Sequence, residues 1–333
     1  MLDLTQFSST LAESMIRFLR HKQALGRTYK AEYFRLKNLD RFLTQQKASD
    51  LDAATFLSWC ETKKHVASGV RRAEMRVVRA FSLYRRRIEP SCYVPDSSLF
   101  PPEHMPRPPY IFSEVEVRRL LDRTLDLRRV GHTPLRCEAI RLALVLLYCA
   151  GLRLGELLRL ETEDYDPAEG VLHIRASKFH KSRKIPLSTD AVSELERYLT
   201  ARHRLGPRKE VGKRLLWNGS RQADGYSRGR LRYTMWQLFD REGICSPDGR
   251  RPTIHSLRHT FAVHALLRWY RSGIELQSKL PQLAIYMGHV SIISTEKYLH
   301  FVPDLISAAD ARFASHSASL LGPPRTDSTE SPS

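Results

Sequence analysis

Seven prolines fall between residues 90 and 109, and this cluster constrains the fold more than any other feature of the chain. Proline fixes φ and has no backbone N–H, so neither a helix nor a central strand continues through such a segment. An extended, semi-rigid connection is expected there. The chain has 333 residues, which exceeds what one hydrophobic core usually organises. We therefore predict a helical domain over residues 1–90, a Pro-rich linker over 91–111 and a second domain that begins at 112.

The first domain is predicted to contain four helices between residue 5 and about residue 88, because helical periodicity there is interrupted only by Gly26 and Gly69. In the second helix, Tyr29, Tyr33, Leu36 and Leu43 share one apolar face. Two of these helices each have a basic face. It consists of Lys30, Lys37 and Arg41 on the second helix, and of Arg72, Arg76, Arg79 and Arg86 on the fourth. Such a face is either solvated or in contact with an anionic partner.

Lys and Arg number 54 against 36 Asp and Glu, which gives a net charge of +18. This balance suits a polyanionic partner, although a merely soluble basic protein has it equally often. Five cysteines without a C-x-x-C pair argue against a disulfide framework or a zinc site and fit a reducing compartment. The N-terminus lacks the pattern of a signal peptide, and the apolar run 142–152 is too short to span a bilayer. These features predict a cytoplasmic protein without a membrane anchor.

The second domain opens with a capping box, in which Ser113 is the N-cap and Glu116 follows three residues later. Residues 138–159 predict a buried helix, a break at Gly151 and a second short helix. Residues 171–175 alternate as a strand, and 184–187 are its hairpin partner. Helices dominate the rest up to 316, and the polar tail 317–333 is predicted to be disordered. The expected fold is mainly α with a small β-hairpin or sheet.

Two arginines of this domain are candidates for binding a phosphodiester. Negative charge grows on the non-bridging oxygens during phosphoryl transfer, and a guanidinium can donate two parallel hydrogen bonds to them. Arg153 follows the helix break at Gly151, and Glu156 could brace it or a neighbouring histidine. Arg258 lies one helical turn after His255, so one helix would present both side chains to one phosphate.

Tyr298 is the candidate nucleophile. A phenol with a pKa of about 10 needs a nearby base or cationic surroundings near neutral pH, and His255 or His289 could supply either. The departing 5′-oxygen needs a proton, which Lys178 in the predicted hairpin turn could give. Other cations crowd the same turn and could equally be phosphate contacts: Lys181, Arg183 and Lys184.

Taken in order, G-L-R-L-G-E-L, the basic hairpin, H-S-L-R-H-T-F-A, G-H and the late tyrosine resemble the tyrosine recombinase (phage integrase) family. The resemblance is specific over about residues 112–305, and it extends to the N-terminal half only as an expected helical core-binding (SAM-like) DNA-binding domain. It implies catalytic roles for Arg153, Lys178, His255, Arg258, His289 and Tyr298, with Glu156 in support. The segment between Arg258 and His289 is somewhat longer than in compact members and is read as a lengthened helix or loop.

The resemblance implies a site-specific DNA recombinase or integrase that cuts and rejoins strands through a 3′-phosphotyrosyl intermediate. Because that bond conserves the phosphodiester energy, neither ATP, a metal nor another cofactor is expected, and no G-x-x-x-x-G-K-[ST] loop is present. The implied partner is double-stranded DNA, bound by a homo- or hetero-tetramer on two sites, with no membrane or small-molecule substrate. The DNA contacts expected from the first domain are Lys30, Lys37, Arg41, Arg72, Arg76 and Arg79.

Two other functions remain open at this point. A type IB topoisomerase would use the same residues but relax supercoiled DNA without a partner site. A DNA-binding regulator with an inert catalytic fold would lack Arg153, Arg258 or Tyr298, and none is missing. The segment after the tyrosine has Leu305, Ala309 and Phe313 on one helical face, and it either packs on its own domain or passes to a neighbouring protomer.

Overall fold

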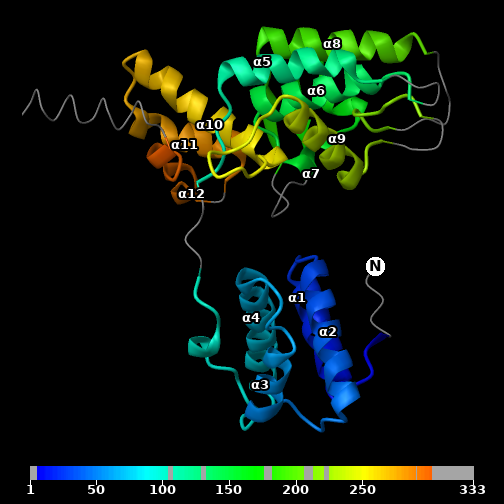
Figure 1. Cartoon of the computed structure of the whole chain (residues 1–333), viewed down its shortest axis with the longest axis vertical. Helices are drawn as coiled ribbons and strands as arrows, with labels where there is room; N and C mark the ends of the chain where they lie inside the picture. Colours follow the sequence, from blue (N-terminus) through cyan, green and yellow to red (C-terminus); the bar gives the residue numbers. More distant parts are fainter. Residues whose placement is uncertain are drawn as a thin grey trace, which may run out of the picture. The chain divides into compact units, whose positions relative to one another are not determined.

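The computed structural model describes residues 6–103, 108–128, 133–175, 182–205, 213–220, 225–289 and 291–301. The chain divides into two compact units, residues 1–107 and 108–333 (Figure 1). This division falls inside the stretch 91–111 that the sequence predicts as a linker.

The first unit contains the four predicted helices: α1 (Ala12–Ala24), α2 (Lys30–Gln46), α3 (Ala53–Glu61) and α4 (Ser68–Arg85). The predicted apolar face of α2 is confirmed by burial of Tyr33, Leu36 and Leu43. Tyr29 instead precedes the helix as its N-cap. The core packs these side chains against aromatic residues of the other helices, among them Phe18 and Trp59.

The proline-rich stretch packs on this unit over much of its described length. Phe100 is buried in the core of the unit, just after the short 3₁₀ turn η2 (Ser97–Leu99). From α4, Arg72 donates to the carbonyl of Pro101 at 2.6 Å, and Arg79 donates to the carbonyl of Pro95. Proline has no backbone N–H, so a proline-rich segment cannot form regular backbone hydrogen bonds and leaves carbonyl groups unpaired. The two arginines donate hydrogen bonds to two of these carbonyls. This part of the chain is therefore attached to α4 and is not a free spacer.

The second unit is built on α6 (Arg136–Cys149), which is apolar nearly all round and is buried as such helices are. It packs against α8 (Thr189–His203) and α10 (Ile254–Arg271), as Figure 1 shows. The remaining helical elements are α5 (Glu114–Arg123), η3 (Thr124–Asp126), α7 (Leu154–Leu157), η4 (Thr162–Asp164), α9 (Arg228–Arg241), α11 (Leu276–Met287), α12 (Ile293–Glu296) and η5 (Leu299–Phe301). The predicted capping box of Ser113 and Glu116 is confirmed at the start of α5.

A small antiparallel sheet has the order β1 (Tyr165–Asp166), β2 (Val171–Ile174) and β3 (Arg183–Pro186). The predicted hairpin of the second and third strands is confirmed, with Leu172 opposite Ile185, and β1 adds a short third strand. Since Ile174 pairs with Arg183, that arginine lies at the start of β3. The mainly α fold class is therefore confirmed.

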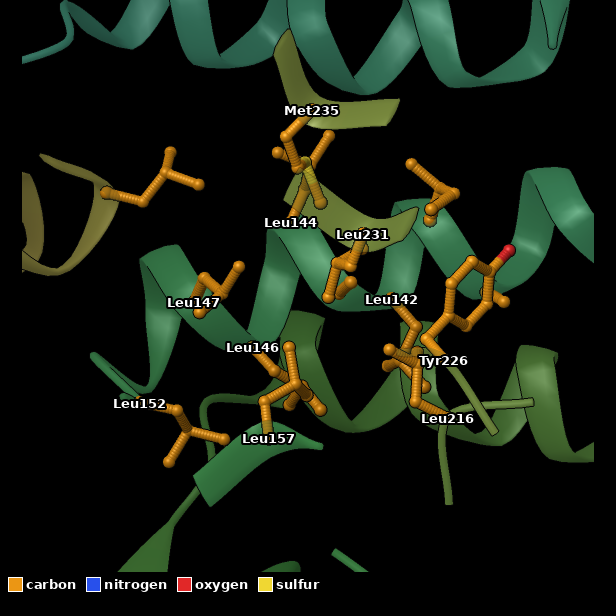
Figure 2. Packing of buried hydrophobic residues seen from close by; sticks show 14 of the residues in the cluster. Leu142, Leu144, Leu146, Leu147, Leu152, Leu157, Leu216, Tyr226, Leu231 and Met235 are labelled. Carbon is orange, nitrogen blue, oxygen red and sulfur yellow. The ribbon is translucent and has the colours of Figure 1, made fainter. Parts of the chain in front are cut away.

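Leucines of α6 form the centre of the larger core, and Figure 2 shows them packed against Leu231 and Met235 of α9. Leu152 and Leu157, on either side of Arg153, are buried in the same cluster. The segment that carries Arg153 is therefore anchored on both sides by apolar contacts, which cost several kcal/mol to remove.

The predicted helix break at Gly151 is confirmed between α6 and α7. Gly151 has φ +57, and an added Cβ would lie 2.5 Å from Cδ1 of Phe261. Both the left-handed backbone and the close approach of α10 therefore require glycine.

We expect Gly151→Ala to destabilise the second unit by about 2–4 kcal/mol. Alanine is strained in the left-handed backbone conformation, and its Cβ would also be too close to the ring of Phe261. Urea unfolding of the full chain, followed through tryptophan fluorescence, measures this change. Gly229→Ala is the matched control, since an added Cβ there meets nothing within 4 Å and φ is ordinary. Equal stability of the two variants would contradict this account of the helix break.

Candidate active site

Arg153 is the N-cap residue of α7, directly after the break at Gly151. Its guanidinium donates to Oε1 of Glu156 at 2.8 Å and to the carbonyl of Gly288 at 2.7 Å. The side chain remains 24% exposed. It is therefore held at two points and still faces solvent.

Glu156 is almost completely buried and binds two arginines. In addition to Arg153, it accepts two N–H groups of Arg183, at 3.1 and 2.9 Å, and the backbone N–H of residue 153. Burial by itself raises the pKa of this carboxyl, but the hydrogen bonds from Arg183 and Arg153 outweigh it and hold the pKa at about 2. The expectation that Glu156 braces Arg153 agrees with this geometry.

Arg258 lies on the first turns of α10 and is 1% exposed. Its guanidinium donates to the carbonyl of Gly151 and, at 2.6 Å, to the carbonyl of Met287. Burial and the nearby charge of Arg153 lower the pKa of Arg258 to about 10, so it remains cationic at neutral pH.

Three successive carbonyls at the end of α11 each accept a hydrogen bond from a different arginine. Arg183 donates to residue 286 at 2.8 Å, Arg258 to residue 287, and Arg153 to residue 288. The last carbonyls of a helix have no partner within the helix and carry its negative dipole end, which favours cations. The C-terminus of α11 thus gathers side chains from α7, β3 and α10.

The helix end itself depends on Gly288, which has φ +65 and forms a left-handed C-cap. An added Cβ would lie 2.9 Å from Nη1 of Arg183. Glycine at this position lets the guanidinium approach the backbone.

Tyr298 follows α12 and is 5% exposed, in an apolar cluster that includes Phe261 and Met287. Its hydroxyl forms a 2.9 Å hydrogen bond with Nδ1 of His259. Burial raises the pKa of Tyr298, while the charges of Arg258 and Arg153 act in the opposite direction. The phenol is therefore neutral at pH 7, and it lies within electrostatic reach of both guanidiniums.

The histidines lie around the tyrosine. The His289 ring stacks on the Tyr298 ring, with the two ring centroids 6.2 Å apart. Nδ1 of His289 forms a 2.8 Å hydrogen bond with Oγ1 of Thr295. His255 packs edge-on against His259, with ring centroids 4.5 Å apart. Burial is the largest cause that lowers the pKa of all three imidazoles, to about 4 for His259 and for His289. The next causes are Arg258 and Arg153 for His255 and His289, and the repulsion that a protonated His259 would have with a protonated His255 and with Arg258. All three imidazoles are neutral at pH 7.

The structure brings together six residues chosen from the sequence: Arg153, Glu156, His255, Arg258, His289 and Tyr298. Lys178 and Lys181 lie outside the described residues, as does the segment with Leu305, Ala309 and Phe313.

Two further side chains belong to the site. The sequence allows Arg183 as a phosphate contact; in the structure its side chain is 10% exposed and is bound to Glu156 and the end of α11. The sequence pattern assigns no role to His259, although it follows Arg258 directly and lies one helical turn after His255.

The basic residues of the first unit differ in whether their side chains are exposed or are engaged in contacts within the unit. Lys30, Arg41 and Arg76 are exposed, whereas Lys37 hydrogen-bonds to Gln6. Arg72 and Arg79 donate to the proline-rich stretch, as described above, and Arg72 also lies 3.7 Å from Glu103. None of the described helices is long and apolar enough to cross a membrane.

The site thus places a buried tyrosine beside two fixed guanidiniums, on a mainly helical domain with a small sheet. Residues 112–303 match the family model described as Phage integrase family, and the chain belongs to that family. Its function is site-specific DNA recombination by a tyrosine-type recombinase. The topoisomerase and regulator alternatives are not favoured.

Relatives match over nearly the whole chain. The Sinorhizobium fredii protein named "Putative integrase/recombinase y4rB" is 28% identical over 91% of this chain and 97% of its own length. Tyrosine recombinase XerD of Staphylococcus aureus is 26% identical, over 87% and 94% respectively. The Tn1549 transposon integrase in complex with transposon right-end DNA shares the fold, with a TM-score of 0.62 at 16% identity, over 92% of this chain and 100% of that one.

Glu156→Gln tests the buried carboxylate. The folded pKa of about 2 lies below the unfolded value of about 4.3, so the ionised carboxylate stabilises the fold by about 3 kcal/mol above pH 4.5. That contribution is lost as the pH falls towards 2. We expect the variant to lose about 3 kcal/mol at pH 7 and to have a weaker pH dependence between 5 and 2, measured by urea unfolding.

Glu163→Gln is the control, because Glu163 is an exposed carboxylate of the same unit. It is expected to change stability by less than about 0.5 kcal/mol. A Glu156→Gln protein as stable as this control at pH 7 would contradict the bridging role of the carboxylate.

Proposed function

We propose that Tyr298 is the nucleophile of strand cleavage and that Arg153 and Arg258 stabilise the phosphate under attack. The observation that carries this proposal is the convergence of both guanidiniums on the end of α11, next to the phenol. The partly exposed Arg153 contacts the non-bridging oxygens. Arg258 supplies a fixed positive charge behind them and retains N–H donors that the two carbonyls do not use.

In the proposed reaction, Oη of Tyr298 bonds to phosphorus and the bond to the 5′-oxygen breaks. The products are a 3′-phosphotyrosyl link and a free 5′-hydroxyl. Attack by the 5′-hydroxyl of a partner strand reverses the step and releases the tyrosine. Lys178 is proposed as the donor of the proton to the departing oxygen, on the basis of its place between β2 and β3 and of the family resemblance. His255 and His289 support the site through their neutral rings.

The proposed substrate is double-stranded DNA, held by a homo- or hetero-tetramer on two sites in the cytoplasm. The net charge of +18 and the exposed Lys30, Arg41 and Arg76 support phosphate contacts from the first unit as well as the second. The XerH recombinase bound to difH substrate offers a fold precedent, with a TM-score of 0.61 at 16% identity over 84% of this chain and 78% of that one.

We expect Tyr298→Phe to bind DNA like the wild type but to form no covalent adduct with a nicked suicide substrate, because the attacking oxygen is gone. Denaturing gel electrophoresis detects the adduct. Tyr148→Phe is the matched control, since Tyr148 is also hydrogen-bonded to a histidine of α10, at 3.0 Å. Persistence of an adduct in the Tyr298→Phe protein would assign the nucleophile to another residue.

Lys178→Ala is expected to slow cleavage about 10²–10⁴-fold, as loss of a general acid does. A substrate with a 5′-thiol leaving group needs no proton on departure, so it should restore the rate. The measurement is the single-turnover rate of adduct formation on both substrates. Failure of the thiol to restore the rate would exclude Lys178 as the proton donor.

A further inference from the structure

The proton of the Tyr298 hydroxyl needs an acceptor. Burial raises the pKa of this phenol, so ionisation without a base is less favourable than in water. The sequence suggested His255 or His289 for this task. In the described part of the chain, however, neither is hydrogen-bonded to Tyr298, and Nδ1 of His289 is engaged with Thr295.

His259 is the histidine placed for the task. Its Nδ1 lies 2.9 Å from Oη of Tyr298, within the range for direct proton transfer. The two rings are tilted by 54°, with centroids 5.5 Å apart. The imidazole is fixed on the long helix α10, next to Arg258 in sequence, so the phenol is held by the same helix that holds the buried guanidinium.

We propose that His259 is the general base for Tyr298. This inference rests on the proposed function, in which Tyr298 is the nucleophile. As Oη bonds to phosphorus, the phenolic proton moves to Nδ1 of His259. The bond to the 5′-oxygen breaks with its electron pair, and that oxygen takes its proton from Lys178. On rejoining, the attacking 5′-hydroxyl gives its proton to Lys178 as its oxygen bonds to phosphorus. The phosphotyrosyl bond breaks, and the imidazolium returns its proton to the phenolate oxygen.

The surroundings of His259 set when it can accept a proton. The titratable and charged groups that face it are His255 and Arg258 on its own helix, His289 after α11, and Tyr298 after α12. Burial and these groups keep the free imidazole neutral at pH 7. In the tautomer that the proposal requires, the ring proton is on Nε2 and Nδ1 accepts the hydrogen bond from the Tyr298 hydroxyl. An anionic phosphate beside Arg258 offsets the positive charge and raises the proton affinity of the ring when DNA is bound.

A matched pair on the same helix provides the control. Nδ1 of His264 lies 3.0 Å from the hydroxyl of Tyr148, and the rings are 5.9 Å apart. Burial shifts both pKa values in the same directions as in the His259 pair, downward for His264 and to about 12 for Tyr148. The His264 pair thus repeats the contact on a tyrosine outside the proposed site.

The test is the single-turnover rate of adduct formation at Tyr298 on a nicked suicide substrate between pH 6 and 9. Four full-length proteins are compared: wild type, His259→Asn, His259→Ala and His264→Asn. Asparagine keeps a hydrogen-bonding amide near the position of Nδ1 but takes no proton. We expect both His259 variants to react about 10²–10⁴-fold more slowly at pH 7. Their log rate should rise with pH at a slope of about one, whereas wild type and His264→Asn stay nearly flat.

Added imidazole should accelerate the His259→Ala protein in proportion to its concentration and leave the other proteins unchanged. The proposal is overturned if His259→Asn keeps the wild-type rate and pH profile, because the contact would then only position the phenol. It is also overturned if the slow variants respond to neither pH nor imidazole. Absence of an adduct at Tyr298 in the wild type would instead refute the proposed function, so the two failures are distinguishable.

Discussion

The site depends on how the last turn of α11 satisfies its carbonyl oxygens. A helix end leaves these acceptors unpaired, and their partial negative charge has to be met by donors. Arginines from three distant parts of the sequence meet it, one for each carbonyl of residues 286, 287 and 288. The same bonds fix the guanidiniums close together, an arrangement that like charges would otherwise oppose.

The buried carboxylate of Glu156 reduces the electrostatic repulsion between these neighbouring guanidiniums. It lies between Arg153 and Arg183 and accepts N–H groups from both, so one negative charge is shared by two cations. Desolvation disfavours an isolated buried charge, but the hydrogen-bonded cluster remains ionised. A net positive charge is left over, and an anionic phosphate is the kind of ligand that balances it.

Much of the architecture follows from local sequence signals. The proline cluster, the capping box at Ser113, the break at Gly151 and the alternating strand 171–175 each correspond to an observed feature, because each reflects short-range backbone chemistry. The attachment of the proline-rich stretch to α4 had no such signal, since it depends on which carbonyls Arg72 and Arg79 reach.

Within the site, the sequence by itself determined which residue types and spacings were available: two arginines, a tyrosine, the i, i+3 pair of Arg153 and Glu156, and the histidines of α10. The family resemblance added their order. Only the tertiary structure decided that Arg183 is an internal brace and that His259, rather than His255 or His289, is hydrogen-bonded to the Tyr298 hydroxyl. These partners come from α7, β3, α10 and the segment after α12, and the contacts exist only when packing around α6 and α11 brings those elements together.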